Sequence, residues 1–267
     1  MTHDEGYFAA DAESQQELER LRLIESLSDL ATTRRLAALG VDTGWQCLEV
    51  GAGAGSIARW LSERVGPDGR VVVTDIDTRF LAGLSRSNIE VRAHDVTKDE
   101  LETDRFDLVH CRTVLCHLGN PEVVLASLVG ALTPGGWILA EEPDFGIIES
   151  ADKDHPLAHH FDTASPKRFA FLREAGIMDG FLGRSLPSLM EKVGLAEVQN
   201  EGLTQIARGG DPASRNWMTV CDRLDGYLHT QGVLSEDEVV GSRSAFQDPT
   251  FHYRSGLVFA VWGKQPK

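Results

Sequence analysis

A run of glycines that follows a short apolar segment most constrains how this chain can fold. Residues 47–56 read CLEVGAGAGS, which predicts a strand, a tight turn and then a helix over Ser56–Val65. Glycine lets the backbone turn and approach a ligand where a Cβ would collide, and the free N–H groups of the helix point at that ligand. Asp75 ends the next predicted strand, where a carboxylate can accept both hydroxyls of a ribose. This pairing is typical of a nucleotide-cofactor site, although an acid there can also cap a turn.

The first half of the chain alternates strands with helices. Leucines recur at three- and four-residue spacing between Ser14 and Leu39, which predicts one or two amphipathic helices before the first strand. Strands are expected near residues 46–50, 70–75, 89–93, 106–112 and 136–141. Such alternation indicates an α/β fold with a parallel, doubly wound sheet, whose ligands bind beyond the carboxyl ends of the strands.

The second half is less regular. Three prolines, a histidine group and several aromatic residues between 142 and 185 predict an irregular lid rather than a core layer. A helix is expected over 185–193, a strand near 196–206, a helical stretch at 217–229 and a last strand at 256–262. We therefore expect N-terminal cap helices (1–40), a core (41–145), a cap insertion (146–184) and a segment that completes the sheet (185–267), with a second insertion at 211–248.

Composition limits the classes of function. Of 267 residues, 42% are hydrophobic, which suffices for a real core. The formal charge of −15 and the lack of a Lys/Arg block argue against a nucleic-acid partner. No apolar run approaches the roughly 20 residues of a membrane span, and the N-terminus lacks the basic start of a signal peptide, so a cytoplasmic protein without a membrane partner is expected. Four cysteines without C-x-x-C spacing indicate structural thiols.

The glycine turn reads G-x-G-x-G, with Glu49 two residues ahead of it, rather than the G-x-G-x-x-G of dinucleotide sites. It resembles motif I of the class I S-adenosylmethionine (SAM) dependent methyltransferases, including small-molecule enzymes with UbiE-like or type 11 or 12 methyltransferase domains. About the first 145 residues match that family in order, through the segments Val73–Asp77, His94–Val96, Phe106–Val109 and Leu132–Gly136. The resemblance implies a Rossmann-like, seven-stranded sheet of order 3-2-1-4-5-7-6, with strand 7 antiparallel, and a mostly helical cap over it.

The resemblance also implies SAM as cofactor and S-adenosylhomocysteine as product. Glu49 would organise the glycine loop and the methionine ammonium, or serve only as a loop acceptor. Asp75 would bind the ribose, and Asp95 would bind the adenine amino group or form an Asx-turn. The expected cofactor residues are Arg22, Glu49, Gly51, Ala52, Gly53, Asp75, Ile76, Asp95, Val96 and Arg112.

Other roles stay open for several of these residues. Ile76 would pack on adenine or lie in the core, and Arg112 would contact the methionine part through its backbone or pair with an acid. Arg22, in preference to Arg20, would bind the SAM carboxylate or lie on a solvated helix face.

His117, just past the fourth strand, is the candidate catalytic base, because its reference pKa of about 6.5 suits proton removal near neutrality. A hydrogen-bonded structural histidine is the alternative, and Asp144 is the second candidate. His155, His159 and His160 have the spacing of a metal group but lack a third ligand pattern, so we expect ordinary lid residues and no metal.

We therefore expect a SAM-dependent methyltransferase of secondary or specialised metabolism, acting on a small organic molecule. O-, N- and C-methylation stay unresolved, and the cap helices could support a homo-oligomer. The alternatives are a nicotinamide-dependent oxidoreductase, a SAM-binding scaffold without turnover, and a SAM-using enzyme such as a cyclase on the same fold.

Overall fold

The computed structural model describes residues 14–267, which form two compact units. Of the described residues, unit 1 comprises 14–142, 182–201 and 259–267, and unit 2 comprises 143–181 and 202–258. Three of the four boundaries fall within strands, namely β5 (Leu132–Asp144), β7 (Ala196–Leu203) and β10 (Leu257–Lys264), and the fourth lies between Phe181 and Leu182.

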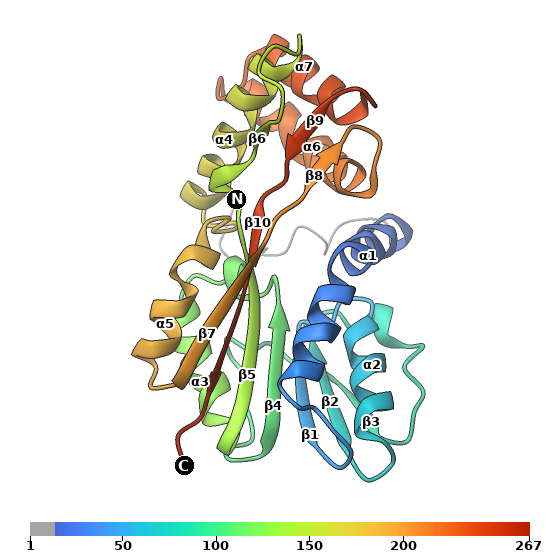
Figure 1. Cartoon of the computed structure of the whole chain (residues 1–267). Helices are drawn as coiled ribbons and strands as arrows, with labels where there is room; N and C mark the ends of the chain where they lie inside the picture. The colour runs from blue at the N-terminus through green and yellow to red at the C-terminus, as the bar shows by residue number, and fades with distance from the viewer. Residues whose placement is uncertain (1–13) are drawn as a thin grey trace. The chain divides into compact units, whose positions relative to one another are not determined.

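A seven-stranded sheet organises the fold, in the order β3-β2-β1-β4-β5-β10-β7 (Figure 1). Its first strands in sequence are β1 (Gln46–Val50), β2 (Arg70–Asp75), β3 (Ile89–Ala93) and β4 (Phe106–Arg112), which pair in parallel with one another and with β5. Near the start of β5, the backbone pairs with the residue that follows β10. Gly135 N donates to Gln265 O over 2.9 Å, and Gln265 N donates to Gly136 O over 2.9 Å. The expected α/β class and the order with an antiparallel last strand are confirmed.

Helices cover this sheet because its central strands, β1, β2, β4 and β5, are mostly apolar and buried on both faces. The helices of unit 1 are α1 (Ser14–Ala38), α2 (Ser56–Val65), α3 (Pro121–Gly130) and α5 (Leu186–Lys192), with short 3-10 turns η1 (Thr78–Leu81), η2 (Leu115–His117) and η4 (Leu182–Ser185). Leu36 of α1 and Leu61 of α2 pack with strand residues such as Val71 on one face. Side chains of opposite parity, such as Leu48 and Val72, are also fully buried, as in a sheet covered on both sides.

Unit 2 contains three longer helices and a small sheet. The helices are α4 (Ala158–Glu174), α6 (Pro212–Thr230) and α7 (Glu236–Gln247), and η3 (Phe145–Ile147) precedes them. The strands β6 (Glu149–Ser150), β9 (His252–Arg254) and β8 (Ile206–Arg208) pair antiparallel in that order. Aromatic rings of α4, α7 and β9 meet in its core, where the centroid of Phe161 lies 5.4 Å from that of Phe246 and 5.0 Å from that of Tyr253.

The structure corrects several expectations. The irregular lid at 142–185 was wrong, because residues 158–174 form the 17-residue helix α4 with Pro166 inside it. Phe161 and Phe169 lie on the buried face of α4, so these two aromatics are core residues. Their helical spacing was not recognised because prolines and clustered histidines interrupt the apolar pattern. The strand expected at 196–206 is two strands in different sheets. Strand β5 is longer than expected at both ends. Of the one or two helices expected before β1, the described residues form one, α1, which agrees with the expectation.

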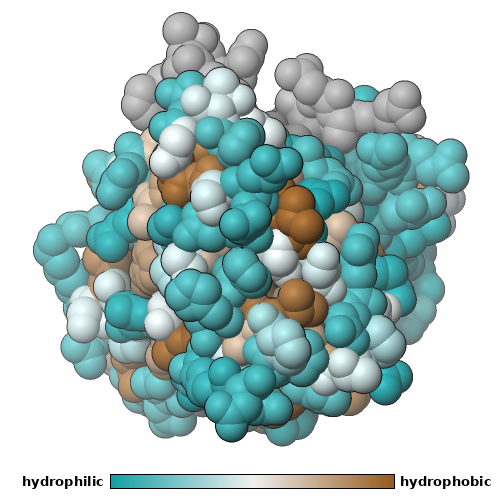
Figure 2. Space-filling model, turned by 90° about the horizontal axis from the view of Figure 1, so that it is seen from above, coloured by the Kyte–Doolittle hydropathy of each residue, from teal (hydrophilic) through white to brown (hydrophobic). Residues whose placement is uncertain are grey.

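Two compositional expectations can be compared with the structure. All four cysteines, Cys47, Cys111, Cys116 and Cys221, are buried free thiols, which agrees with a structural role. In residues 14–267, none of the helices combines the length and the apolar character that crossing a membrane requires. Figure 2 shows a face that is mostly hydrophilic, with hydrophobic residues scattered among the charged and polar ones.

Candidate functional site

The glycine turn between β1 and α2 has a backbone that only glycine adopts easily. Gly51, Gly53 and Gly55 have φ angles of 67°, 57° and 82°, in the left-handed region. A Cβ on Gly51 would lie 2.3 Å from Cγ2 of Val114, in the turn after β4. At this position glycine is therefore required by both conformation and space.

Asp75, at the end of β2, contacts the glycine turn directly. Its Oδ2 accepts a hydrogen bond from Gly53 N over 3.0 Å, and its Oδ1 accepts one from Asp77 N over 2.9 Å. Burial raises the pKa of the Asp75 carboxyl, and these two backbone hydrogen bonds oppose the rise. A carboxylate has about four acceptor positions, so both oxygens can accept further hydrogen bonds. The neighbouring Ile76 is 57% exposed, which excludes the core alternative for its side chain.

Glu49 is buried on the face of the sheet that α1 and α2 cover. Its Oε2 lies 2.7 Å from Nδ1 of His110, the adjacent residue of β4, and Nε2 of His110 lies 3.6 Å from Oε2 of Glu141 on β5. Burial lowers the pKa of His110, but the two carboxylates outweigh burial and raise it to about 9. Sequence reasoning missed His110 and Glu141. The available signal was an ionisable residue directly after an apolar run in each strand, since His110 follows Leu108 and Val109, and Glu141 follows residues 137–140.

A row of polar residues on α1 fastens this helix to the glycine turn. Glu25 Oε1 accepts a hydrogen bond from Ser56 N, the first residue of α2, over 3.0 Å. Asp29 Oδ1 accepts from Ser56 Oγ over 3.1 Å and from Arg112 Nη2 over 2.9 Å. Leu21 adds an apolar contact, because a Cβ on Gly53 would lie 3.3 Å from its Cδ2. The N-terminal half of α1 therefore packs against the turn.

The same face of α1 continues towards the carboxyl end of β5. Thr32 donates to Glu141 Oε2 and accepts from Arg112 Nη1, and Arg35 Nη1 lies 2.6 Å from Glu141 Oε1. Burial would raise the pKa of Glu141, but His110, Thr32 and Arg112 bring it down to about 2. The α1 residues at 25, 29, 32 and 35 were not among the predicted site residues. Their three- and four-residue spacing among leucines was the signal that could have found them.

Two of the other cofactor candidates, Arg112 and Asp95, bind side chains or backbone groups of the protein itself. Arg112 pairs with an acid, Asp29, as one alternative expected. Asp95 Oδ1 accepts hydrogen bonds from Thr97 N (3.0 Å) and Thr97 Oγ1 (2.6 Å), which is the Asx-turn alternative and lowers the pKa of Asp95. Val96 follows it and is half-buried. The adenine contacts of Asp95 and Val96 stay predictions.

Arg22 and the histidine group have surroundings that bear on their predicted roles. Arg22 is exposed on α1, whereas Arg20 is less exposed and pairs with Glu17 at 2.6 Å. His155 precedes α4, and its Nε2 lies 3.3 Å from Thr250 Oγ1, so it does not share a helical turn with His159. Within residues 14–267, no group of three or more His, Cys, Asp or Glu side chains could hold a metal ion.

The candidate base His117 ends the turn η2, which a buried carboxylate anchors. Glu142 accepts hydrogen bonds from the backbone N–H groups of Val114 (3.1 Å), Leu115 (2.8 Å) and Cys116 (3.1 Å). Burial raises the pKa of Glu142 to about 7 despite these bonds. Asp144, the second candidate, accepts from Gly146 N over 2.9 Å in a local turn of unit 2. Glu142 therefore positions the segment that carries His117.

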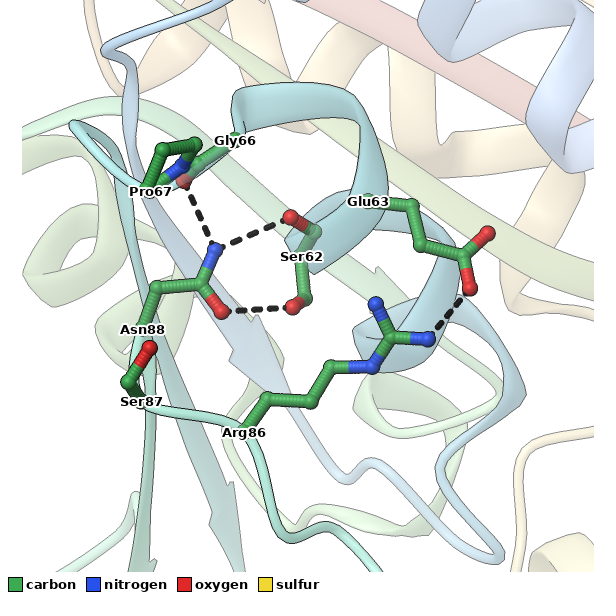
Figure 3. A pocket seen from close by; sticks show the side chains of 7 residues that line it. All are labelled: Ser62, Glu63, Gly66, Pro67, Arg86, Ser87 and Asn88. Carbon is green, nitrogen blue, oxygen red and sulfur yellow. Dashed lines mark hydrogen bonds and ion pairs between the residues drawn. The ribbon is translucent and has the colours of Figure 1, made fainter.

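A shallow hollow at the C-terminal end of α2 has a structural explanation (Figure 3). Asn88 donates to the carbonyls of Ser62 and Gly66 over 2.9 and 2.8 Å, and accepts from Ser62 Oγ over 2.6 Å. Arg86 pairs with Glu63 beside them. These polar groups bind one another, at the end of α2 that is far from the glycine turn.

Known proteins are similar to the part of the chain that contains the glycine turn. Residues 15–200 match the family described as "Methyltransferase domain". Methyltransferase str3 of Strobilurus tenacellus is 33% identical over 159 residues, which are 59% of this chain and 55% of that protein. The ubiquinone/menaquinone biosynthesis C-methyltransferase UbiE of Pseudomonas savastanoi is 33% identical over 39% of this chain and 43% of its own length. The chain spans about half the length of the curated relatives it matches.

Solved structures share the fold. A methyltransferase structure from Bacillus halodurans, described as putative in its name, has a TM-score of 0.58 and 17% identity, and the match covers 90% of this chain and all of that one. A phosphoethanolamine N-methyltransferase 2 of Haemonchus contortus, in complex with phosphomonomethylethanolamine and S-adenosylhomocysteine, also has a TM-score of 0.58 and 17% identity, with 96% and 59% covered. At such identities the likeness establishes the fold alone.

Proposed function

Since the chain belongs to this methyltransferase domain family, we propose that it is a SAM-dependent methyltransferase (EC 2.1.1.-) acting on a small organic acceptor. SAM is the methyl donor and S-adenosylhomocysteine the product. The observation that carries the proposal is the contact of Asp75 with Gly53 N, which joins the acid of β2 to the glycine turn.

The residues at the turn fit an adenosine with a methionine tail. Asp75 keeps acceptor positions for ribose hydroxyls, and the exposed Ile76 beside it offers an apolar surface for a base. The left-handed backbone of Gly51 and Gly53 leaves no Cβ between the turn and a ligand. We propose that Glu49, Ala52, Asp95, Val96, Arg112 and Arg22 complete the donor site, as the family resemblance implies.

The sulfonium of SAM supplies an already activated methyl group, so this chain has to align the partners and, for a neutral acceptor, accept a proton. We assign the proton to the imidazole of His117. Glu142 holds the turn before it through three backbone hydrogen bonds, which keeps the ring in a defined place. An acceptor that is already anionic would need only the alignment.

The acceptor is proposed as small and organic for two reasons. One similar protein is named for the C-methylation of quinones, and one solved structure with this fold contains a phosphobase. A quinone and a phosphobase are both small molecules. With 41 acidic against 26 basic residues, the chain lacks the cationic surface that nucleic acids require. A cytoplasmic location, a homo-oligomer through the cap helices and the cap boundaries themselves stay predictions.

Two measurements test the proposal. Calorimetry should show binding of SAM and S-adenosylhomocysteine but not of NAD. Incubation with SAM and a panel of phenols, amines and amino acids should then give a product 14 Da heavier, together with S-adenosylhomocysteine. Tight NAD binding without any response to S-adenosylhomocysteine would overturn the proposal, and donor binding without turnover on any acceptor would favour a scaffold.

A further inference from the structure

We propose that His110 is a positioning residue for the methyl donor. Its cationic ring, on β4, bridges β1 and β5 and thereby holds the Glu49 side chain in place. The inference rests on the proposed function, because Glu49 is the acid expected at the methionine ammonium. His110 itself is fully buried and is not proposed to touch the donor or the acceptor.

The register of the sheet places the three residues together. His110 stands directly opposite Glu49 in the β1–β4 pair, and Arg112, two residues further on, stands opposite Glu141 in the β4–β5 pair. The imidazole is therefore between two carboxylates, with Nδ1 at 2.7 Å from Glu49 and Nε2 at 3.6 Å from Glu141. The shorter distance is a hydrogen bond, and the longer one is an ion pair.

The balance of buried charge requires a cation at His110. The charged groups that face it are Glu49 from β1, Glu141 from β5 and Arg35 from α1, with Arg112 and Asp29 paired beside them. Arg35 lies 2.6 Å from Glu141 and 2.9 Å from Glu201, so its charge is shared by those two carboxylates. The charge of Glu49 is left to the imidazole, 2.7 Å away. A buried carboxylate without a cation is costly, which keeps His110 protonated and raises its pKa to about 9.

The bridge acts at one end of the glycine turn, and α1 acts at the other. Glu49 lies two residues before Gly51, and Ser56, which binds Glu25 and Asp29 of α1, directly follows Gly55. Thr32 and Arg112 join the two ends through Glu141 and Asp29. Loss of the charge on His110 should therefore release Glu49 while the α2 end of the turn stays fastened.

The test compares His110→Gln with Cys111→Ala. The second variant is a control on the same strand, because it removes a buried, uncharged thiol. At pH 7, His110→Gln should weaken S-adenosylhomocysteine binding about 10- to 100-fold and raise KM for SAM equally, with kcat nearly unchanged. Cys111→Ala should bind as the parent does. In a Glu49→Gln background, His110→Gln should have no further effect, because the bridge then has nothing to hold.

A measurement on the unaltered protein removes the dependence on a folded variant. Nitrogen-15 NMR of the His110 ring should show both nitrogens protonated at pH 8, and parent affinity for S-adenosylhomocysteine should fall towards that of His110→Gln as pH rises through about 9. A neutral ring at pH 7, or an equal loss of affinity with and without Glu49, would overturn the inference. If the parent does not bind S-adenosylhomocysteine at all, the proposed function fails instead, while the NMR result still decides whether the bridge exists.

Discussion

Asp75 offers the sharpest test at the scale of one residue. If its carboxylate binds both ribose hydroxyls, Asp75→Ala should weaken SAM binding by about 2–4 kcal/mol, since each hydrogen bond to a charged group contributes roughly 1.5–3 kcal/mol before water replaces part of it. Calorimetry on the folded variant measures the loss. Asp77→Ala is the control, because that carboxylate pairs with Arg79 instead. Unchanged affinity in Asp75→Ala would remove the residue from the site.

Gly51 tests whether the turn needs glycine for space as well as for conformation. Gly51→Ala would place a Cβ 2.3 Å from Val114 at a φ of +67°, so we expect unfolding free energy to fall by about 2–4 kcal/mol and donor binding to be lost. Gly40→Ala is a matched control, because Gly40 also has a positive φ of +89° but nothing within 4 Å of the added Cβ. Urea titration of both variants separates the two costs. Equal losses would show that the contact with Val114 does not matter.

His117 separates chemistry from binding. If its ring removes the acceptor proton, His117→Ala should bind S-adenosylhomocysteine as the parent does and methylate about 10²–10⁴-fold more slowly. The acidic limb of the rate profile should disappear, and a more acidic acceptor should recover part of the rate. Methylation of the natural acceptor at the parent rate would mean that the protein works by alignment alone.

The first helix shows how one element can belong to the site without carrying a recognised motif. Asp29 links α1 to Ser56 of α2 and to Arg112 of β4, at a half-buried position. Asp29→Ala should therefore weaken donor binding, because the glycine turn loses a contact, and should speed hydrogen exchange in α1. We expect the free energy of donor binding to become less favourable by about 1 kcal/mol, because the Asp29–Arg112 pair is partly solvated. Glu19→Ala, at an exposed position of the same helix, should change neither quantity. Faster exchange in both variants would mean that α1 frays independently of the contact.

At the scale of the whole molecule, buried ionisable groups predict how stability depends on pH. The pKa of His110 is raised from 6.5 to about 9 in the folded state, so its stabilisation is complete below pH 6.5 and is lost as pH rises through 9. Glu142, whose pKa is raised from 4.5 to about 7, destabilises the fold increasingly between those values. Unfolding free energy should therefore decline by on the order of 2–3 kcal/mol from pH 6.5 to 9.5.

Urea titrations at fixed ionic strength measure this decline. The stability gap between the parent and His110→Gln should narrow over the same interval, because the parent ring loses its proton. A gap that stays constant from pH 6.5 to 9.5 would contradict a titrating His110.

Local patterns predicted the donor half of the fold well. Apolar runs, glycines and short-range spacing, which a sequence displays directly, set the strand that ends at Val50, the helix Ser56–Val65 and Asp75 at the end of β2. The order of the sheet followed from the family resemblance and is confirmed. Helix α4 was missed, because the buried stripe through Phe161 and Phe169 only acquires meaning when other segments cover it.

The sequence by itself thus determined the α/β class, the glycine turn and the acid that contacts it, because these depend on neighbours a few residues apart. Only the tertiary structure decided that His110 lies between Glu49 and Glu141 and that α1 fastens Ser56 and Arg112. These contacts join residues 27 to 83 positions apart, from Asp29 with Ser56 to Asp29 with Arg112. Burial and charge at such distances exist only after the strands have paired and the helix has packed, so no local pattern contains them.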